Sequence, residues 1–300
     1  MDKVHLINST TPVQKLNYKI GNTNIYMKRD DLIDFAFGGN KVRLFEYIAA
    51  DILKKNADKI ITFGSLHSNH VRVAAVVATR LGIQCDIIVL FEDSVDDNSI
   101  PPNLKLVSYC NNTHIEYCET RKAHDFIDEY LAEQNSLGIN FYWIPGGGHT
   151  ALAAQGYREA AIEILEQTHG INLDAMFLPC GTGTTQAGLI NGLEHKVPVY
   201  GVTVARSIER CHNEIEYLLK QMTASAATNY EINVLPCEIC YGEENSLLNT
   251  TILHLVQTDG IFLDPVYNAK SFLTMTQFIS NHPELKDVVY INTGGSPNLF

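Results

Sequence analysis

Short continuous apolar runs alternate with longer amphipathic stretches, and this alternation constrains the fold more than any other feature of the chain. Ile87–Leu90 and Ala175–Leu178 are uninterrupted apolar runs, which are typical of strands buried on both faces. Arg121–Ala132 and Ala151–Gln167 are longer stretches with the pattern of helices. Strands that alternate with helices predict an α/β protein with parallel-rich sheets covered by helices.

The charge and hydropathy of the chain exclude two classes of partner. The 22 Lys and Arg residues against 34 Asp and Glu residues give a net charge of −12, which opposes binding to nucleic acid or to an acidic membrane surface. The longest aliphatic run, about Val73–Ala78, is far shorter than a membrane-spanning helix. A small anionic ligand stays compatible with this composition, because backbone dipoles can hold it locally.

The cysteine pattern favours a reducing compartment. Seven cysteines are scattered along the chain, and Met1–Thr10 lacks the pattern of a secretory signal, so we expect a cytoplasmic protein with free thiols. Cys237 and Cys240 form a C-x-x-C pair, but two further ligands at suitable spacing are missing, so no metal site is expected.

A loop rich in glycine and threonine separates a predicted strand from a helix predicted at about Gln186–Leu193. It consists of Gly181, Thr182, Gly183, Thr184 and Thr185. Backbone N–H groups and the helix dipole at such a junction favour an anion, so the loop is a candidate phosphate site. A tight turn that needs only small residues is the structural alternative.

A dinucleotide is a weaker explanation for this loop. Gly181, Gly183 and Gly188 are spaced one residue too widely for the dinucleotide-binding fingerprint, and the loop lies in the second half of the chain. An NAD-dependent dehydrogenase therefore stays open only as a less favoured alternative.

Lys41 follows two glycines at a predicted helix start. Gly38 and Gly39 allow a tight turn, and the positive end of the helix dipole should push the Lys41 amine toward its neutral form. A neutral amine is what covalent chemistry on a carbonyl requires. A solvent-exposed lysine in a first helical turn is the structural alternative.

Four segments read together identify a family. They are Gly38–Arg43, Ser68–Arg72, Gly181–Thr185 and Thr293–Gly295. In this order and spacing the chain resembles the pyridoxal-phosphate (PLP) enzymes of the two-domain tryptophan-synthase-β-like fold, fold type II. Within them it is similar to the D-cysteine desulfhydrase and 1-aminocyclopropane-1-carboxylate (ACC) deaminase family, over about residues 10–300. Arg43 and Arg72 are expected to form structural ion pairs.

The resemblance implies a role for each matching residue. Lys41 matches the lysine that binds the cofactor covalently, and Thr293 matches the hydroxyl residue facing the pyridine nitrogen. Gly181, Thr182, Gly183, Thr184 and Thr185 match the cofactor-phosphate loop. Ser68, Asn69 and His70 match the loop that holds the substrate carboxylate and, through Asn69, the cofactor's ring oxygen. Tyr241 and Tyr267 fall where the family carries two active-site tyrosines, and Lys41 or Ser68 would take the Cα proton.

The domain prediction follows the same fold. We expect a large cofactor-binding domain formed by residues 1–45 and 155–300, and a small substrate-side domain formed by residues 46–154. The cofactor would lie in the cleft between them. The family resemblance also implies a homodimer acting on a small amino acid.

Several departures from the family pattern bear on the substrate. His67 stands where the family usually has Gln, Leu44 where it often has a basic residue, and Asn292 where His is common. Asn268 follows Tyr267 where ACC deaminases carry Glu. Asn268, together with His70 where Gln would follow Ser-Asn, favours D-cysteine-desulfhydrase-like β-elimination over ACC deamination. The altered His67 and Leu44 leave a catalytically inactive protein that binds PLP or an amino acid as the third possibility.

Overall fold

The computed structural model describes residues 2–92, 100–223, 230–239 and 245–300. The strands are β1 Val13–Ile20, β2 Thr23–Arg29, β3 Lys59–Ser65, β4 Gln84–Phe91, β5 Thr113–Glu119, β6 Phe141–Ile144, β7 Ala175–Cys180, β8 Val199–Thr203, β9 Asn233–Leu235 and β10 Asp287–Asn292. The α-helices are α1 Asn40–Lys54, α2 Asn69–Leu81, α3 Pro102–Val107, α4 Ala123–Ser136, α5 Ala151–Gln167, α6 Thr184–Leu193, α7 Ile208–Met222, α8 Ser246–Asp259 and α9 Asn268–Ser280. Short 3-10 helices are η1 Asp30–Leu32, η2 Thr120–Lys122, η3 Gly146–Gly148 and η4 Ser296–Leu299.

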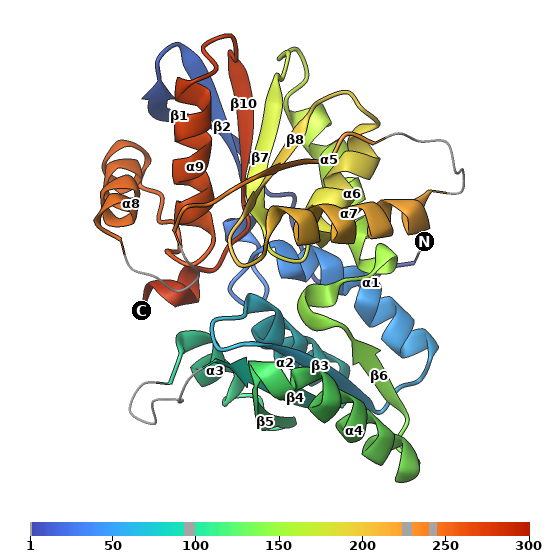
Figure 1. Cartoon of the computed structure of the whole chain (residues 1–300). Helices are drawn as coiled ribbons and strands as arrows, with labels where there is room; N and C mark the ends of the chain where they lie inside the picture. The colour runs from blue at the N-terminus through green and yellow to red at the C-terminus, as the bar shows by residue number, and fades with distance from the viewer. Residues whose placement is uncertain (1, 93–99, 224–229, 240–244) are drawn as a thin grey trace.

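The strands form two sheets, which occupy the upper and lower halves of Figure 1. The larger sheet has the order β1-β2-β10-β7-β8-β9, and the smaller has the order β5-β4-β3-β6. The β1–β2 pair is antiparallel, and the other neighbouring pairs are parallel. The predicted α/β class with parallel-rich sheets is confirmed.

Strand β7 shows why a continuous apolar run marks a covered sheet. Ala175 and Phe177 pack into the cluster that contains residues of α8 and α9. Met176 and Leu178 face the opposite way, into the cluster that contains residues of α1, α5, α6 and α7. Because successive side chains point to opposite faces, burial on both sides requires apolar residues at every position.

Two strands were not predicted. β1 has an alternating sequence in which Leu16 and Tyr18 are buried while Lys15, Asn17 and Lys19 are exposed, as is normal for an antiparallel edge strand. β9 is a three-residue strand added to the opposite edge. A search for continuous apolar runs therefore misses the two edge strands of the larger sheet.

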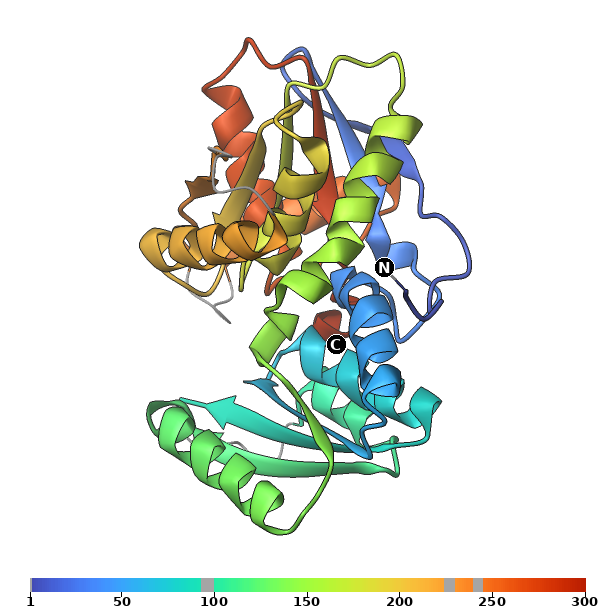
Figure 2. The same ribbon diagram turned by 90° about the vertical axis from the view of Figure 1, so that its right-hand side faces the viewer.

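Helices α1 and α5 connect the two halves of the molecule (Figure 2). The predicted domain boundaries, after residues 45 and 154, fall inside these two continuous helices. The boundaries stay a prediction, although the four strands of the smaller sheet lie within residues 46–154.

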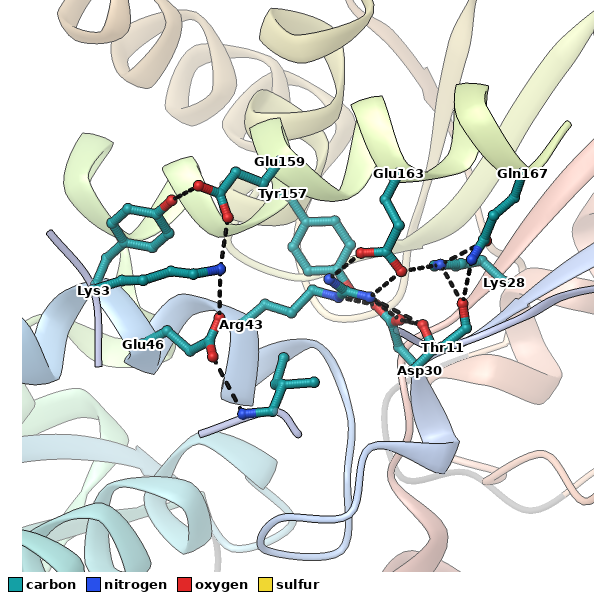
Figure 3. Close-up of polar contacts among 12 residues, drawn as sticks. Lys3, Thr11, Lys28, Asp30, Arg43, Glu46, Tyr157, Glu159, Glu163 and Gln167 are labelled. Carbon is teal, nitrogen blue, oxygen red and sulfur yellow. Dashed lines mark hydrogen bonds and ion pairs between the residues drawn. The ribbon is translucent and has the colours of Figure 1, made fainter. Parts of the chain in front are cut away.

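A buried polar network fastens α1 to α5 (Figure 3). Arg43 donates to both carboxylate oxygens of Asp30, at 2.9 and 2.8 Å, and also pairs with Glu163 at 3.0 Å. Tyr157 donates a further hydrogen bond to Asp30 at 2.5 Å. Burial alone would raise the pKa of Asp30, but the charge of Arg43 holds that pKa below its ordinary value. The predicted structural ion pair of Arg43 is confirmed.

Within the described residues, none of the helices combines the length and the apolar character that a membrane crossing demands.

Candidate active site

A cavity of about 610 Å³ lies where the carboxyl ends of strands from both sheets meet. Its walls include nearly all of the candidate residues: Lys41, Ser68, Asn69, His70, Gly181, Thr182, Gly183, Thr184, Thr185, Tyr267 and Thr293. Tyr241, like Cys240, lies outside the described residues. Residues far apart in the sequence thus converge at the place where open α/β sheets bind their ligands.

The turn before α1 positions Lys41. Gly39 has φ of +100°, and a Cβ there would lie 2.6 Å from the carbonyl oxygen of Thr293, so only glycine fits without rearrangement. The Gly39 N–H donates to the Asp30 carbonyl at 2.8 Å, and the Asn40 N–H donates to the Thr293 carbonyl at 3.0 Å. The helix start is therefore tied to β10 and η1, and Lys41 enters the cavity in the first turn.

The Lys41 amine is adapted to react as a neutral group. Its Nζ donates to the Gly147 carbonyl at 2.8 Å. Burial, with a further contribution from the charge of Arg206, lowers the pKa of Lys41 to about 8. The predicted direction is right, but the main cause of the lowered pKa is burial and not the helix dipole.

The glycine–threonine loop turns sharply from β7 into α6. Gly183 precedes the helix with φ of +79°, and the Thr182 and Thr184 hydroxyls lie 3.1 Å apart. Thr185 accepts a hydrogen bond from the Asn40 side chain at 2.9 Å. The helix begins two residues before the predicted start, so Thr184 and Thr185 add first-turn N–H groups. This geometry suits an anion.

The opposite wall of the cavity is the N-terminus of α2. Ser68 is the N-cap residue, but its side chain makes no capping hydrogen bond. The Asn69 carbonyl oxygen accepts from Arg72 at 2.7 Å and from Asn103 at 3.1 Å. These bonds orient the Asn69 amide and leave its NH₂ group as a donor.

Arg72 differs from its prediction. Its guanidinium donates to the Ala36 carbonyl at 2.9 Å and to the side-chain oxygens of Asn69 and Asn103. Burial lowers the pKa of Arg72 to about 10, against the attraction of the more distant Asp264. Arg72 therefore stabilises the α2 turn through neutral acceptors, and the expected ion pair is not found within the part of the chain that the structure describes.

His70 is a buried neutral imidazole. The Thr62 hydroxyl donates to the Ile144 carbonyl at 2.8 Å, so it accepts from His70 Nε2 at 2.8 Å. This fixes the proton on Nε2 and leaves Nδ1 as a buried acceptor that has no hydrogen-bond partner among the described residues. Burial holds the pKa of His70 well below its usual range. In this form Nδ1 can accept a hydrogen bond but cannot donate one, so this nitrogen does not suit contact with the substrate carboxylate, which the resemblance implies for the loop of Ser68, Asn69 and His70.

Thr293 and Tyr267 lie at the floor of the cavity. Thr293 follows β10, and Asn268 Oδ1 accepts from both its N–H, at 3.0 Å, and its hydroxyl, at 3.3 Å. Tyr267 precedes α9, where its N–H donates to the buried Asp264 carboxylate at 2.8 Å. Asn268 and Asp264 thus hold the two predicted residues in place.

Sequence reasoning missed Arg206 and His149. Arg206 follows β8 and lines the cavity beside the loop. Its place after the strand next to β7 was the available signal, because the carboxyl ends of neighbouring parallel strands share one edge. His149 follows η3 and contacts Thr184. Nothing in its local sequence indicated that contact.

Comparison with known proteins decides the family. A model of the family described as "Pyridoxal-phosphate dependent enzyme" matches residues 4–294. The chain belongs to this family. Its cofactor is pyridoxal phosphate, which removes the dehydrogenase alternative, and its fold is the predicted fold type II.

Solved structures of similar shape agree with the resemblance. A structure described as an ACC deaminase homologue is 28% identical, with a TM-score of 0.89, and the match covers 100% of this chain and 94% of that chain. A hydrogen sulfide-producing enzyme from Fusobacterium nucleatum is 17% identical, with a TM-score of 0.72 and coverage of 97% of both chains. A fungal L-serine ammonia-lyase from Rhizomucor miehei is 18% identical, with a TM-score of 0.70 and coverage of 96% and 94%. The last two comparisons show the shared fold alone.

The residues of this PLP-dependent enzyme fit its cofactor. Lys41 supplies a readily deprotonated amine, and the loop from Gly181 to Thr185 supplies N–H and hydroxyl donors for a phosphate. The unsatisfied Nδ1 of His70 lies in the wall of the same cavity, as expected for a site shaped to receive a polar ligand.

Proposed function

We propose that this enzyme catalyses the deaminating β-elimination of a small amino acid, with D-cysteine as the preferred substrate. D-Cysteine and water would give pyruvate, ammonia and hydrogen sulfide. The observation that carries the proposal is that one cavity joins a lysine amine of pKa about 8 to a helix N-terminus suited to a carboxylate.

The α2 N-terminus is the proposed carboxylate site. The first N–H groups of a helix have no partner within the helix, and the helix dipole favours a negative charge there. The Ser68 hydroxyl makes no capping bond, and the Asn69 NH₂ group is oriented by Arg72. These donors would fix the substrate with its Cα close to Lys41.

Lys41 is the proposed base for the Cα proton. When bound, the cofactor supplies the electron sink that stabilises negative charge at Cα. A positioned base typically contributes about 10²–10⁴-fold to the rate. With a pKa of about 8, roughly a tenth of the Lys41 amine is neutral at pH 7. Ser68 Oγ is the alternative base.

Thr293 is the proposed partner of the pyridine nitrogen. Asn268 Oδ1 also accepts from the Thr293 N–H at 3.0 Å, so the 3.3 Å bond from the Thr293 hydroxyl is the weaker of the two. The hydroxyl can therefore turn toward a ligand. Because a neutral hydroxyl does not hold a proton on the ring nitrogen as a carboxylate does, elimination is favoured over racemisation and transamination. Tyr267 and Tyr241 are the proposed groups that polarise the leaving group.

ACC deamination is the second candidate, and the structural similarity to an ACC deaminase homologue favours it. Against it, Asn268 is an amide where ACC deaminases carry a carboxylate, and it is fully occupied in holding Thr293 and Asp264. A protein that binds PLP without turnover is the third candidate.

Product analysis separates these functions. The cofactor-loaded protein would be incubated with D-cysteine, L-cysteine and ACC, and sulfide, pyruvate and 2-oxobutanoate measured, with Lys41→Ala as the control. We expect sulfide and pyruvate in equal amounts from D-cysteine, and none from the variant. 2-Oxobutanoate from ACC without sulfide from cysteine would favour the second candidate, and no product from any substrate the third. The homodimer and the cytoplasmic location stay predictions.

A further inference from the structure

His149 lies between the phosphate loop and helix α7. Its Nδ1 lies 3.4 Å from the Thr184 hydroxyl. Its Nε2 lies 2.8 Å from a carboxylate oxygen of Glu214, which is an ion-pair distance, but the two groups are not aligned for a hydrogen bond. The imidazole ring is roughly parallel to the Tyr217 ring, and the two ring centroids are 6.3 Å apart. Only 14% of the His149 side chain is exposed. One imidazole thus connects the loop that receives phosphate to a carboxylate behind it.

Glu214 also lies close to two arginines. Its second oxygen lies 3.3 Å from the guanidinium of Arg206 and 3.8 Å from that of Arg210. Arg206 and Arg210 both line the cavity, so Glu214 fixes an imidazole on one side and two guanidinium groups on the other. The charged groups that face His149 come from α1, α7 and the segment before α7.

The groups around His149 shift its pKa in opposite directions. Burial lowers the pKa of His149, and the charge of Glu214 raises it. The charge of Arg206 lowers the pKa, a backbone hydrogen bond at Thr182 raises it, and the charge of Lys41 lowers it. The net pKa lies below the ordinary value, so the imidazole is largely neutral at neutral pH while the loop holds no anion. A dianion bound at Thr184 adds negative charge on the other side of the ring and favours the protonated form.

The geometry points to His149 as a positioning residue that takes up one proton from solvent when a phosphate dianion binds in the loop. Protonated Nδ1–H then donates to the Thr184 oxygen, which leaves the Thr184 O–H free to donate to the phosphate. Glu214 lies beside Nε2 and balances the positive charge of the ring. This inference does not depend on the proposed function. It needs only a cofactor phosphate in the loop, as membership of the family implies, and it holds for any amino-acid substrate.

Sulfate is the probe for this proton, because it stays a dianion across the titration range of histidine. The protein would carry Lys41→Met, which removes the other titratable amine of the cavity. Calorimetry in two buffers of different ionisation enthalpy measures the protons taken up on sulfate binding. We expect the protein to take up nearly one proton per sulfate bound near pH 7. The affinity for sulfate should fall about tenfold for each unit of rising pH in the range where the free imidazole is neutral and the sulfate-bound imidazole is protonated.

Adding His149→Gln should abolish both the uptake and the pH dependence of the affinity. His212→Gln is the matched control, since His212 is an exposed histidine on α7, the helix that carries Glu214, and it should leave both unchanged. Glu214→Gln should move the midpoint to lower pH. Equal proton uptake with and without His149 would overturn the inference.

Two further measurements cover the ways this design could fail. If His149→Gln does not fold, the NMR titration of the histidines in the wild-type protein must show one buried histidine whose midpoint rises on adding sulfate; the absence of such a shift overturns the inference. If sulfate does not bind, non-covalent binding of PLP to the Lys41→Met protein replaces it. If His149→Gln left the affinity for PLP unchanged, that result would also overturn the inference. A positive result together with no turnover of D-cysteine would reject the proposed function alone.

Discussion

Replacing Lys41 with methionine should stabilise the cofactor-free protein while preventing covalent attachment of the cofactor. Methionine is of similar length and keeps the apolar contacts, but it removes an amine whose pKa is about 8 instead of 10.5. When the folded pKa of a lysine lies below the unfolded pKa, the unfolded chain binds the proton more tightly. The charged amine therefore costs stability below the folded pKa, and the cost fades as the pH rises toward the unfolded pKa.

The magnitude follows from the two pKa values. One pKa unit corresponds to about 1.4 kcal/mol, so the buried amine costs roughly 3 kcal/mol at pH 7. The variant also loses the hydrogen bond from Lys41 Nζ to the Gly147 carbonyl, worth about 2 kcal/mol for a charged donor. We expect a net gain of about 1 kcal/mol in the free energy of unfolding at pH 7.

The pH dependence is the sharper test, because the hydrogen-bond contribution changes less. At about pH 10 the folded amine is neutral and the unfolded amine is only partly protonated, so the protonation cost falls to roughly 1 kcal/mol. Urea unfolding of both cofactor-free proteins, followed by circular dichroism between about pH 7 and pH 10, measures the difference. Wild type should gain about 2 kcal/mol relative to the variant over this range.

Lys19→Met is the control for this experiment, since Lys19 is an exposed lysine on β1. It should leave the pH dependence of wild type unchanged. A constant gap between Lys41→Met and wild type across the whole pH range would refute the reasoning, because it would mean that the amine titrates alike in both states.

Three other substitutions test separate parts of the structure. Arg43→Met leaves Asp30 buried without its partner, so the free energy of unfolding should fall by about 3–5 kcal/mol in urea titrations; a loss under about 1 kcal/mol would contradict the network's role. Gly183→Ala places a residue with a side chain at φ of +79° and its Cβ 2.6 Å from Ile215. This strain should weaken PLP binding by about 1–3 kcal/mol in equilibrium dialysis, and an unchanged affinity would exclude it. Thr293→Glu should hold a proton on the ring nitrogen and raise the share of racemised or transaminated product in chromatography; an unchanged product ratio would argue against its role.

What the sequence predicts well is local. The apolar run of β7 requires two covered faces, and Gly39 before Lys41 requires a turn at a helix start. Both requirements are met by residues within a few positions of each other, so pattern and spacing are enough to find them. The edge strand β1 was missed because its alternating pattern serves only one buried face.

Protonation states depend instead on residues brought together by the fold. The tautomer of His70 follows from the Thr62 hydroxyl, which in turn donates to the Ile144 carbonyl on a different strand. The same holds for His149, whose partner Glu214 lies far along the chain on α7. No local pattern contains either relation, so the roles of these two histidines could not be read from the sequence.

The position of Lys41 depends on both kinds of information. Asp30 accepts the Gly39 N–H through its carbonyl, on one side of Lys41, and binds Arg43 through its carboxylate, on the other. One buried residue therefore fixes the backbone on both sides of the reactive amine. Because Arg43 also ties α1 to Glu163 of α5, the network that stabilises the junction of the two halves is the same one that aims Lys41 into the cavity. Damage to this network should reduce stability and covalent cofactor attachment together, whereas loss of the Lys41 amine alone should separate them.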